Sequence, residues 1–388
     1  MNFDKLTERR GTGCNKWDKA QKLYNVPDDC LPMWVADTDF ELPDFVLDAG
    51  RRMLDHGILG YGFDNDAYLA STAWWLDSRH GWSPDPSDIF TANGLCNAIA
   101  LCLDTFTDPG DGVIVFTPVY PEFESTVTGA NRRLVQSEMV LDGERYVMDL
   151  DALEEQLQGD EKAVLFCSPH NPVGRVWDRA ELDALAEFVR RHDLLLMSDE
   201  IHQDLVYPGA NHTPLTLIDD LSERLIMLTA VTKTFPMPGM RVGNIIINDP
   251  TLRQAMAARF RALKFQPTTM GPALATAAQT PEGSQWADAL VAYLDGNRKA
   301  FADGIGSIPG LRMTPIEATF LAWVDFSGTG MTTEEFTARV ERDAGIAANR
   351  GVTFGPGGEQ FLRFNLGTQR TRIEEALSRL SRAFGDLQ

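Results

Sequence analysis

AVLFCSPHNPVGRVWDRAELDALAEFVRRHDLLLMSD, residues 163–199, places two short apolar runs on either side of a helical pattern. Asp178 and Glu181 have the spacing of a capping box, and apolar side chains recur every three or four residues after them. A strand, a helix and a second strand at this spacing form a βαβ unit with parallel strands. The segment therefore predicts an α/β fold, in which helices cover both faces of a largely parallel sheet.

Further apolar runs extend this sheet in both directions along the chain. Residues 113–116, 225–228 and 242–247 have the length and composition of buried strands. Residues 200–224 show no strong helical pattern, so we expect an irregular connection there. Residues 284–305 have the length and composition of one long helix.

Charge and composition exclude several classes of function. The net charge is −21 and no basic block offsets it, which argues against a nucleic-acid or anionic-membrane partner. No apolar stretch is long enough to span a membrane, and the first ten residues lack the apolar segment of a signal peptide. The five cysteines form no C-x-x-C pair and the histidines no H-x-x-x-H pair. We therefore expect a cytoplasmic protein with reduced thiols and no metal site.

Three polar residues follow three of the predicted strands. Asn171, Asp199 and Lys233 each stand just after an apolar run. Because carboxyl ends of parallel strands meet at one edge, these side chains are expected to lie close together. Taken one at a time, these residues could be an asparagine in a turn, an aspartate that caps a helix and a partly exposed lysine. Their expected position on the same edge of the sheet favours a ligand-binding site instead.

Lys233 is the most unusual of the three, because an ammonium at the end of an apolar run is costly without a partner or a task. Other lysines, as in NKWDKAQKLY at residues 15–24, stand in polar surroundings typical of the surface.

Pyridoxal 5′-phosphate (PLP) is a cofactor that requires this set of groups. It uses a lysine amine for a Schiff base, a carboxylate near the pyridine nitrogen and a donor to the ring oxygen O3′. Its phosphate could be bound by Arg241 and by the backbone N–H groups of the helix that begins after Asn93-Gly94. Tyr120 is placed to lie on the ring, although an aromatic residue in an ordinary loop would look the same.

The motifs SPHNPVG, SDEIH and TKTFPMPGMRVG, in this order, resemble the fold-type-I PLP enzymes of the aminotransferase class I/II superfamily. LPMWVADTDFELP, GYGFDND, TPVYPEF, SDEIHQDL and GGEQFLRFNLG resemble its cystathionine β-lyase or cysteine-S-conjugate β-lyase branch. The resemblance covers essentially the whole chain. It implies an α/β fold with a large PLP-binding domain, whose mostly parallel seven-stranded sheet has helices on both faces, and a smaller α/β domain from both termini.

The same resemblance implies the domain boundaries. Residues 1–48 would belong to the small domain and the substrate wall, residues 49–285 would form the large PLP-binding domain, and residues 286–388 would form the C-terminal small domain.

The resemblance also assigns roles to the residues at the strand ends. Lys233 would form the Schiff base with PLP, and Asp199 would pair with the pyridinium nitrogen. Asn171 would bond O3′, with a cis peptide before Pro172. Tyr120 would stack on the ring, and Lys233, Tyr120 and Asp199 together would be the catalytic residues.

Further residues would hold the phosphate and the substrate. The phosphate would bind to Gly94, Leu95, Cys96, Thr232 and Arg241, with Tyr61 reaching in from the neighbouring subunit. This sharing implies a homodimer with shared active sites. The substrate would contact Arg363, Ala36, Asp37 and Asn171, with Arg363 gripping the α-carboxylate. The alternation in residues 360–366 suits a half-buried strand that carries Arg363 on one face.

Three positions depart from the superfamily pattern. Ala230 stands where a phosphate-binding serine is common, which leaves Thr232 or Thr229 to substitute. His202 stands where aminotransferases carry a tyrosine that bonds O3′, so we count it with the cofactor-binding residues of the lyase branch. Arg241 is usual in aminotransferases and absent from many β-lyases.

The predicted function is therefore a PLP-dependent C–S β-lyase. Its reaction would be α,β-elimination of an L-cysteine thioether, either cystathionine or a cysteine S-conjugate, to a thiol, pyruvate and ammonia. An aminotransferase on the same fold is the alternative, and a PLP-binding regulatory protein is a third hypothesis.

Overall fold

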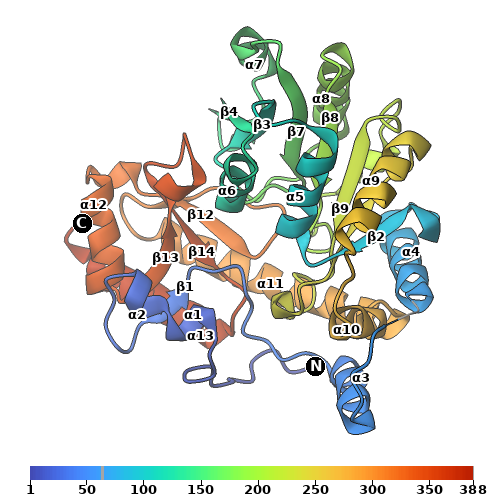
Figure 1. Ribbon diagram of the computed structural model, residues 1–388. Coiled ribbons are helices and arrows are strands. Elements are labelled where there is room, and N and C mark those ends of the chain that lie inside the picture. The colour runs from blue at the N-terminus through green and yellow to red at the C-terminus, as the bar shows by residue number, and fades with distance from the viewer. Residues whose placement is uncertain (63–64, 388) are drawn as a thin grey trace.

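The computed structural model describes residues 1–62 and 65–387 of the 388-residue chain. Its larger sheet has seven strands in the order β2-β10-β9-β8-β7-β3-β4 (Figure 1). Their bounds are β2 Ile89–Ala92, β3 Gly112–Thr117, β4 Arg133–Glu138, β7 Glu161–Cys167, β8 Leu195–Asp199, β9 Leu225–Thr229 and β10 Gly243–Ile246. The pairs from β9 to β4 are parallel, and only β10 runs antiparallel to its neighbours. The mostly parallel seven-stranded sheet is confirmed.

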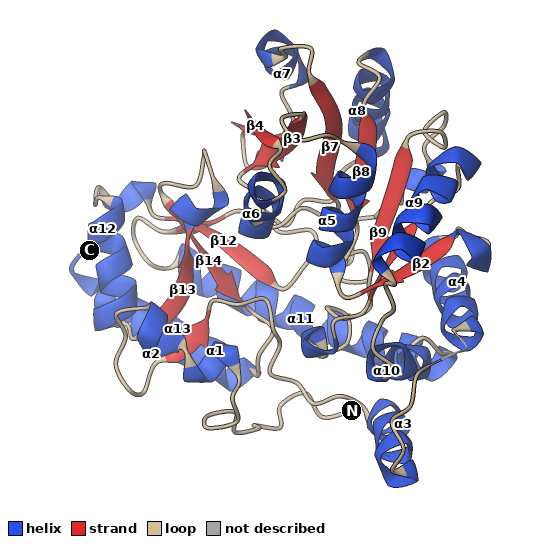
Figure 2. Ribbon diagram, viewed as in Figure 1, coloured by secondary structure: helices blue, strands red, loops and turns tan. Residues whose placement is uncertain are grey.

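Alternation along the strands sends side chains to two separate cores. In β3, Val113 and Val115 join one core, whereas Ile114 and Phe116 join the other. Both cores are closed by helices, so helices cover both faces as predicted (Figure 2). The helices of this part are α4 Asp66–His80, α5 Leu95–Phe106, α6 Pro121–Gly129, α7 Leu150–Gln156, α8 Arg179–Arg191, α9 Pro250–Leu263 and α10 Met270–Ala278.

The βαβ unit forms as its sequence predicts. The Asp178 side chain accepts a hydrogen bond from Glu181 N at 3.0 Å, and the Glu181 side chain accepts one from Asp178 N at 2.8 Å. This capping box starts α8, whose apolar face is buried against the sheet. Residues 200–224 contain no α-helix, in agreement with the expected irregular connection. Strands β5 Val140–Asp142 and β6 Arg145–Val147 form a separate small hairpin, which comes between β4 and β7 along the chain.

The second sheet combines both ends of the chain. Its order is β1-β13-β14-β12-β11, and β1 pairs with β13 in parallel, with Leu31 opposite Ile346. The bounds are β1 Leu31–Met33, β11 Arg312–Met313, β12 Leu321–Asp325, β13 Ile346–Arg350 and β14 Phe361–Asn365. The helices here are α1 Asn15–Asp18, α2 Ala20–Leu23, α12 Thr333–Ala338 and α13 Arg370–Ala383. Figure 1 shows α1, α2 and β1 beside β13 and α13, so the smaller α/β unit from both ends of the chain is confirmed.

Two helices connect these parts. The predicted long helix is α11, Pro281–Gly306, which packs on α10 and also on β11 and α13. Helix α3, Asp44–His56, packs against α10. Among the described residues, no helix combines the length and apolarity needed to cross a membrane.

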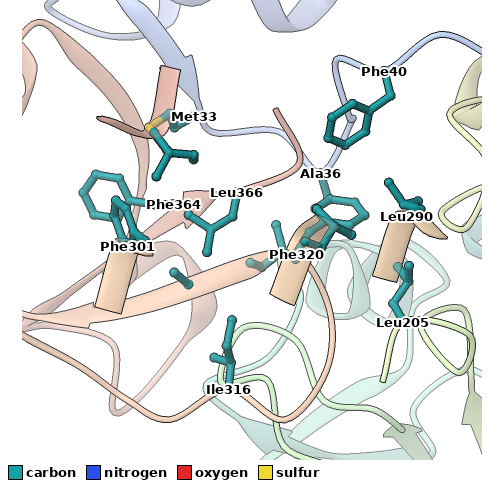
Figure 3. Packing of buried hydrophobic residues seen from close by; sticks show 14 of the residues in the cluster. Met33, Ala36, Phe40, Leu205, Leu290, Phe301, Ile316, Phe320, Phe364 and Leu366 are labelled. Atoms are coloured by element: carbon teal, nitrogen blue, oxygen red, sulfur yellow. The ribbon is translucent and has the colours of Figure 1, made fainter. Parts of the chain in front are cut away.

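Strand β14 is more buried than its alternation indicated. Leu362 and Phe364 are as inaccessible as Arg363 on the opposite face, and all are at most 3% exposed. The expectation of a half-buried strand is wrong, because β14 lies between β12 and β13 and both of its faces are covered. Figure 3 shows Phe364 packed near Phe301 of α11, with a ring-centroid separation of 5.6 Å.

The segment after β1 packs into the same core. Ala36 and Phe40 lie in one apolar cluster with Leu290 of α11, Leu205 and Phe320 (Figure 3). This packing holds the segment across the carboxyl edge of the large sheet, where the polar residues lie.

Candidate active site

A cavity of about 880 Å³ lies at the carboxyl edge of the parallel strands. Asn171, Asp199 and Lys233, which follow β7, end β8 and follow β9, all line it. The structure therefore brings together the three residues that were predicted from their positions after strands. Ala36 and Asp37 line the opposite side, as expected for the substrate wall.

The Lys233 amine points at this wall. Its Nζ donates a hydrogen bond to the backbone oxygen of Ala36 at 2.5 Å. Burial lowers the pKa of Lys233 to about 8; Asp37 opposes this shift, whereas Arg363 adds to it. A lysine with this pKa exists partly as the neutral amine at physiological pH, which is the form that acts as a nucleophile or a base.

Asp199 is a buried carboxylate without a strong cationic partner. Burial raises its pKa to about 7, although a hydrogen bond from Ile201 N at 3.1 Å and the charge of Lys233 act in the other direction. Within residues 1–62 and 65–387, Ile201 N is the only hydrogen-bond donor to this carboxylate. A protonated ring nitrogen placed here would stabilise the ionised form.

Arg363 lies behind Asn171 rather than in the cavity lining. Its NH1 donates to Asn171 Oδ1 at 2.9 Å, and its NH2 donates to Trp34 O at 2.9 Å and to Asn349 Oδ1 at 2.6 Å. Burial lowers its pKa to about 10. In the part of the chain that the structure describes, this guanidinium has no carboxylate partner, and its Nε has no hydrogen bond. A buried guanidinium without an anion is suited to bind one.

Several of the residues predicted to hold the phosphate lie at the start of α5. Gly94 caps this helix with a φ of 87°, and Leu95 and Cys96 follow in its first turn, all three at the cavity. Arg241 lies against Gly94, since a Cβ built on this glycine would be 3.7 Å from Arg241 Cδ. Among the described residues the Arg241 guanidinium has neither an ion pair nor a hydrogen bond. Backbone N–H groups and a free guanidinium thus meet at one point, as an anion site requires.

Thr232, rather than Thr229, faces this cavity. Thr232 belongs to the lining, whereas the Thr229 hydroxyl accepts a hydrogen bond from Asn244 Nδ2 at 3.4 Å. Of the two threonines that could take the place of the missing serine, Thr232 is therefore the one that lies at the cavity.

Tyr120 and His202 complete the lining near the lysine. Burial raises the pKa of Tyr120, so its phenol keeps its proton. Burial, together with the charges of Lys233 and Arg363, lowers the pKa of His202 to about 3. Its imidazole is therefore neutral, and its buried Nδ1 has no hydrogen-bond partner in the described structure.

Among the described residues, Tyr61 is predicted for the site but lies away from the cavity of its own chain, whereas Arg363 at least contacts the lining residue Asn171. The Tyr61 side chain is 97% exposed and does not line the cavity. Two residues of its motif, Phe63 and Asp64, lie outside the described residues.

The sequence did not reveal the contacts that hold the substrate wall, the segment that contains Ala36 and Asp37. Lys16, interpreted as a surface lysine, is fully buried and pairs with Asp39 at 2.8 Å. Asp39 also accepts from Trp17 Nε1 and from Arg9, which bonds Asp37 as well at 2.6 Å. Burial alone would raise the pKa of Asp39, but the charges of Lys16 and Arg372 and the hydrogen bonds from Lys16 and Trp17 lower it to about 2. The sequence signal for this support was the pair of aspartates in VADTDF, Asp37 and Asp39. Their cationic partners Arg9 and Lys16 lie near the N-terminus, where a local pattern does not reveal them.

These features fit PLP as the group that the cavity holds. The site offers a lysine of lowered pKa, a buried carboxylate that lacks a cation, an unpartnered imidazole nitrogen and a free guanidinium at a helix N-terminus. PLP would supply a counterpart to each of these groups. Its aldehyde would react with the lysine, and its ring nitrogen would pair with the carboxylate. Its ring oxygen would face the imidazole, and its phosphate would bind to the guanidinium. Asn171-Pro172 is a cis peptide, as the resemblance implied.

Comparison with known proteins agrees with this geometry. The chain matches the aminotransferase class I and II family over residues 33–380. It is 35% identical to cystathionine β-lyase PatB of Bacillus subtilis over 387 residues, which cover 99% of this chain and 100% of that protein.

Two solved structures share the fold over nearly the full length. Cystalysin from Treponema denticola, which contains PLP, is 34% identical with a TM-score of 0.94, covering 100% of this chain and 99% of that one. The PLP-bound C–S lyase from Staphylococcus hominis is 26% identical with a TM-score of 0.90, covering 99% of each chain. The match over residues 33–380 shows that the chain belongs to the aminotransferase class I and II family.

Proposed function

We propose that the protein is a PLP-dependent C–S β-lyase, which converts an L-cysteine thioether to a thiol, pyruvate and ammonia. The observation that carries this proposal is the Lys233 amine, held near the wall with a pKa of about 8, close to a buried guanidinium that lacks an anion. The full-length similarity to one protein named cystathionine β-lyase and to another named C–S lyase favours elimination over other reactions of the family.

The geometry of the cavity supports a role for each of the proposed cofactor residues. Lys233 would bind the PLP aldehyde, Asp199 would hold the proton on the ring nitrogen, and Asn171 and His202 would face the ring oxygen. The phosphate would bind to Gly94, Leu95, Cys96, Thr232 and Arg241. When bound, PLP draws electrons away from the substrate Cα and so stabilises negative charge there.

Arg363 would hold the substrate by its α-carboxylate. The guanidinium is buried, and its hydrogen bonds to Asn171, Asn349 and the Trp34 carbonyl orient it without neutralising its charge. A carboxylate at this point would supply the missing countercharge through a charge-assisted hydrogen bond. Ala36 and Asp37 would border the remainder of the substrate, because they form the facing wall.

Lys233 would then act as the general base. Once the substrate amine has replaced it, the neutral Nζ takes the proton from Cα, a step that such catalysis speeds by about 10²–10⁴-fold. The Cβ–S bond breaks with its electron pair on sulfur, and Tyr120 or the Lys233 ammonium gives the proton that makes the thiol. Tyr120 can serve because burial keeps its phenol protonated.

Product analysis tests the reaction class. With cystathionine or a cysteine S-conjugate and no added 2-oxo acid, we expect pyruvate and free thiol in equal amounts, measured by chromatography and thiol titration. Arg241, which aminotransferases of the superfamily keep, makes transamination the second candidate. Turnover that strictly requires a 2-oxo acid and converts it to an amino acid would establish that candidate instead.

We also propose a homodimer with shared sites, in which Tyr61 reaches the phosphate of the neighbouring subunit. Tyr61 is almost fully exposed in the single chain, and Leu54, Ile58 and Leu59 beside it are each at least 61% exposed. Clustered exposed apolar side chains are typical of an interface. We further propose the domain boundaries at residues 48–49 and 285–286, which the two separate sheets support. Each boundary falls inside a helix that continues across it, α3 at the first and α11 at the second.

Complementation between two inactive variants tests the shared site. Co-expressed Lys233→Ala and Tyr61→Ala chains form mixed dimers, in which one site combines an intact Lys233 with the partner subunit's Tyr61. At a PLP concentration too low to load the Tyr61→Ala parent, we expect about a quarter of wild-type activity, since half of the dimers are mixed and each has one intact site. No recovery above the two parents would place Tyr61 in the site of its own chain or outside both.

A further inference from the structure

Asp204 is a buried carboxylate outside the cofactor site that collects four hydrogen-bond donors. Trp75 Nε1 donates at 3.1 Å, Arg79 Nε at 3.2 Å and His80 Nε2 at 2.8 Å, all from α4. The fourth donor is the Thr234 hydroxyl, at 2.6 Å. One carboxylate thus joins α4 to the turn that carries Lys233.

The charge on this carboxylate is stabilised within the protein. Burial alone would raise the pKa of Asp204, but the interactions with His80, Arg79 and Thr234 outweigh it and lower the pKa. The group therefore remains an ionised acceptor, and hydrogen bonds to it are stronger than those between neutral groups.

The residues after Lys233 are anchored on two sides. Thr234 is completely buried and bonded to Asp204. Phe235, also completely buried, packs against Trp75 at 5.9 Å and stacks on Trp286 of α11 at 5.0 Å. The backbone that sets the direction of the Lys233 side chain is thus held by the hydrogen bond of Thr234 and by the two aromatic contacts of Phe235.

We propose that Asp204, acting through Thr234, is a positioning residue that sets where the Lys233 amine stands relative to the substrate Cα. The proposal rests on the function proposed above for Lys233. Lysine has four flexible side-chain bonds, so the position of its amine depends on how well the backbone is fixed. Displacement of a reacting group by 1 Å can cost about 10²-fold in rate.

Thr234→Val tests this, because it keeps the shape of the side chain and removes the donor to Asp204. We expect kcat to fall by about 10–100-fold, whereas KM changes less than about threefold because the substrate contacts remain. The pH midpoint of the visible absorbance of the lysine-bound cofactor should also shift. Thr234→Ser, which restores the hydroxyl, should recover both values.

Ser284→Ala is the matched control. Ser284 Oγ accepts from Arg79 NH1 at 2.6 Å, so this variant weakens the same network away from Thr234. It should lower Tm slightly and leave kcat and the absorbance midpoint at wild-type values. If Thr234→Val likewise lowers only Tm, Asp204 has a structural role alone and the proposal is overturned.

The spectrum of Lys233→Ala separates this proposal from the one on which it rests. If that variant keeps the visible absorbance, Lys233 is not the cofactor lysine and both proposals fail. If it loses the absorbance while Thr234→Val matches the wild type, only the role of Asp204 fails.

Discussion

Lys233→Ala is expected to lose at least about 10⁴-fold in kcat, because one substitution removes both the amine that binds the cofactor and the general base. No described group replaces it, since the neighbouring Tyr120 holds its proton and His202 is neutral with a pKa of about 3. The purified variant should also lack the visible absorbance that PLP shows when bound to lysine. Steady-state turnover and the absorbance spectrum check the two expectations separately.

Lys299→Ala is the matched control for this variant. Lys299 is a solvent-exposed lysine on α11 whose pair with Asp295 contributes little. It should keep wild-type turnover and spectrum. Borohydride reduction followed by peptide mapping gives an independent check, and a label on any lysine other than Lys233 contradicts the assignment.

Asp199→Asn is expected to lose about 10³-fold or more in kcat while still binding PLP. The substitution keeps the shape of the side chain but removes the negative charge that holds a proton on the ring nitrogen. Without that proton the cofactor stabilises the charge at the substrate Cα poorly. Turnover under saturating PLP measures the effect, and Asp183→Asn, at an exposed acid on α8, is the control. Near-normal turnover would remove Asp199 from the mechanism.

The same variant has a signature in the cofactor-free protein. Because the folded-state pKa of Asp199 is raised from 3.8 to about 7, the folded chain binds the proton more tightly than the unfolded chain. The parent therefore loses stability as pH rises between these two values, whereas Asp199→Asn loses none through this group. The Tm of the variant relative to the parent should rise over that range in cofactor-free samples, and it should not rise if the carboxylate is ionised throughout.

The pattern of apolar runs and the residues that follow them was sufficient to predict the arrangement at the carboxyl edge of the parallel sheet. The apolar runs that end before Asn171, Asp199 and Lys233 became β7, β8 and β9, and the three side chains meet at one cavity. The Asp178 capping box formed because both of its partners belong to the same helix turn. Such features depend on neighbours within a few residues, which a single sequence displays directly.

The contacts that complete the site were not visible in the same way. Lys16 looked like a surface residue because its neighbours are polar, yet it is buried against Asp39. Arg363 reaches Asn171 across 192 positions of sequence, and Thr234 reaches Asp204 across 30. Tyr61 is 97% exposed and, within the described part of the chain, does not line the cavity.

The parallel sheet, the order of the polar residues at its strand ends and, through the motifs, the cofactor could all be predicted from the amino-acid sequence. The burial of both faces of β14, the pairing of the charges and, among the described residues, the absence of an anion beside Arg363 became apparent only in the folded chain. This difference arises because periodicity reports which face of an element is apolar. Burial of a charge and the identity of its partner depend on elements that lie far apart in sequence and meet only when the chain has folded.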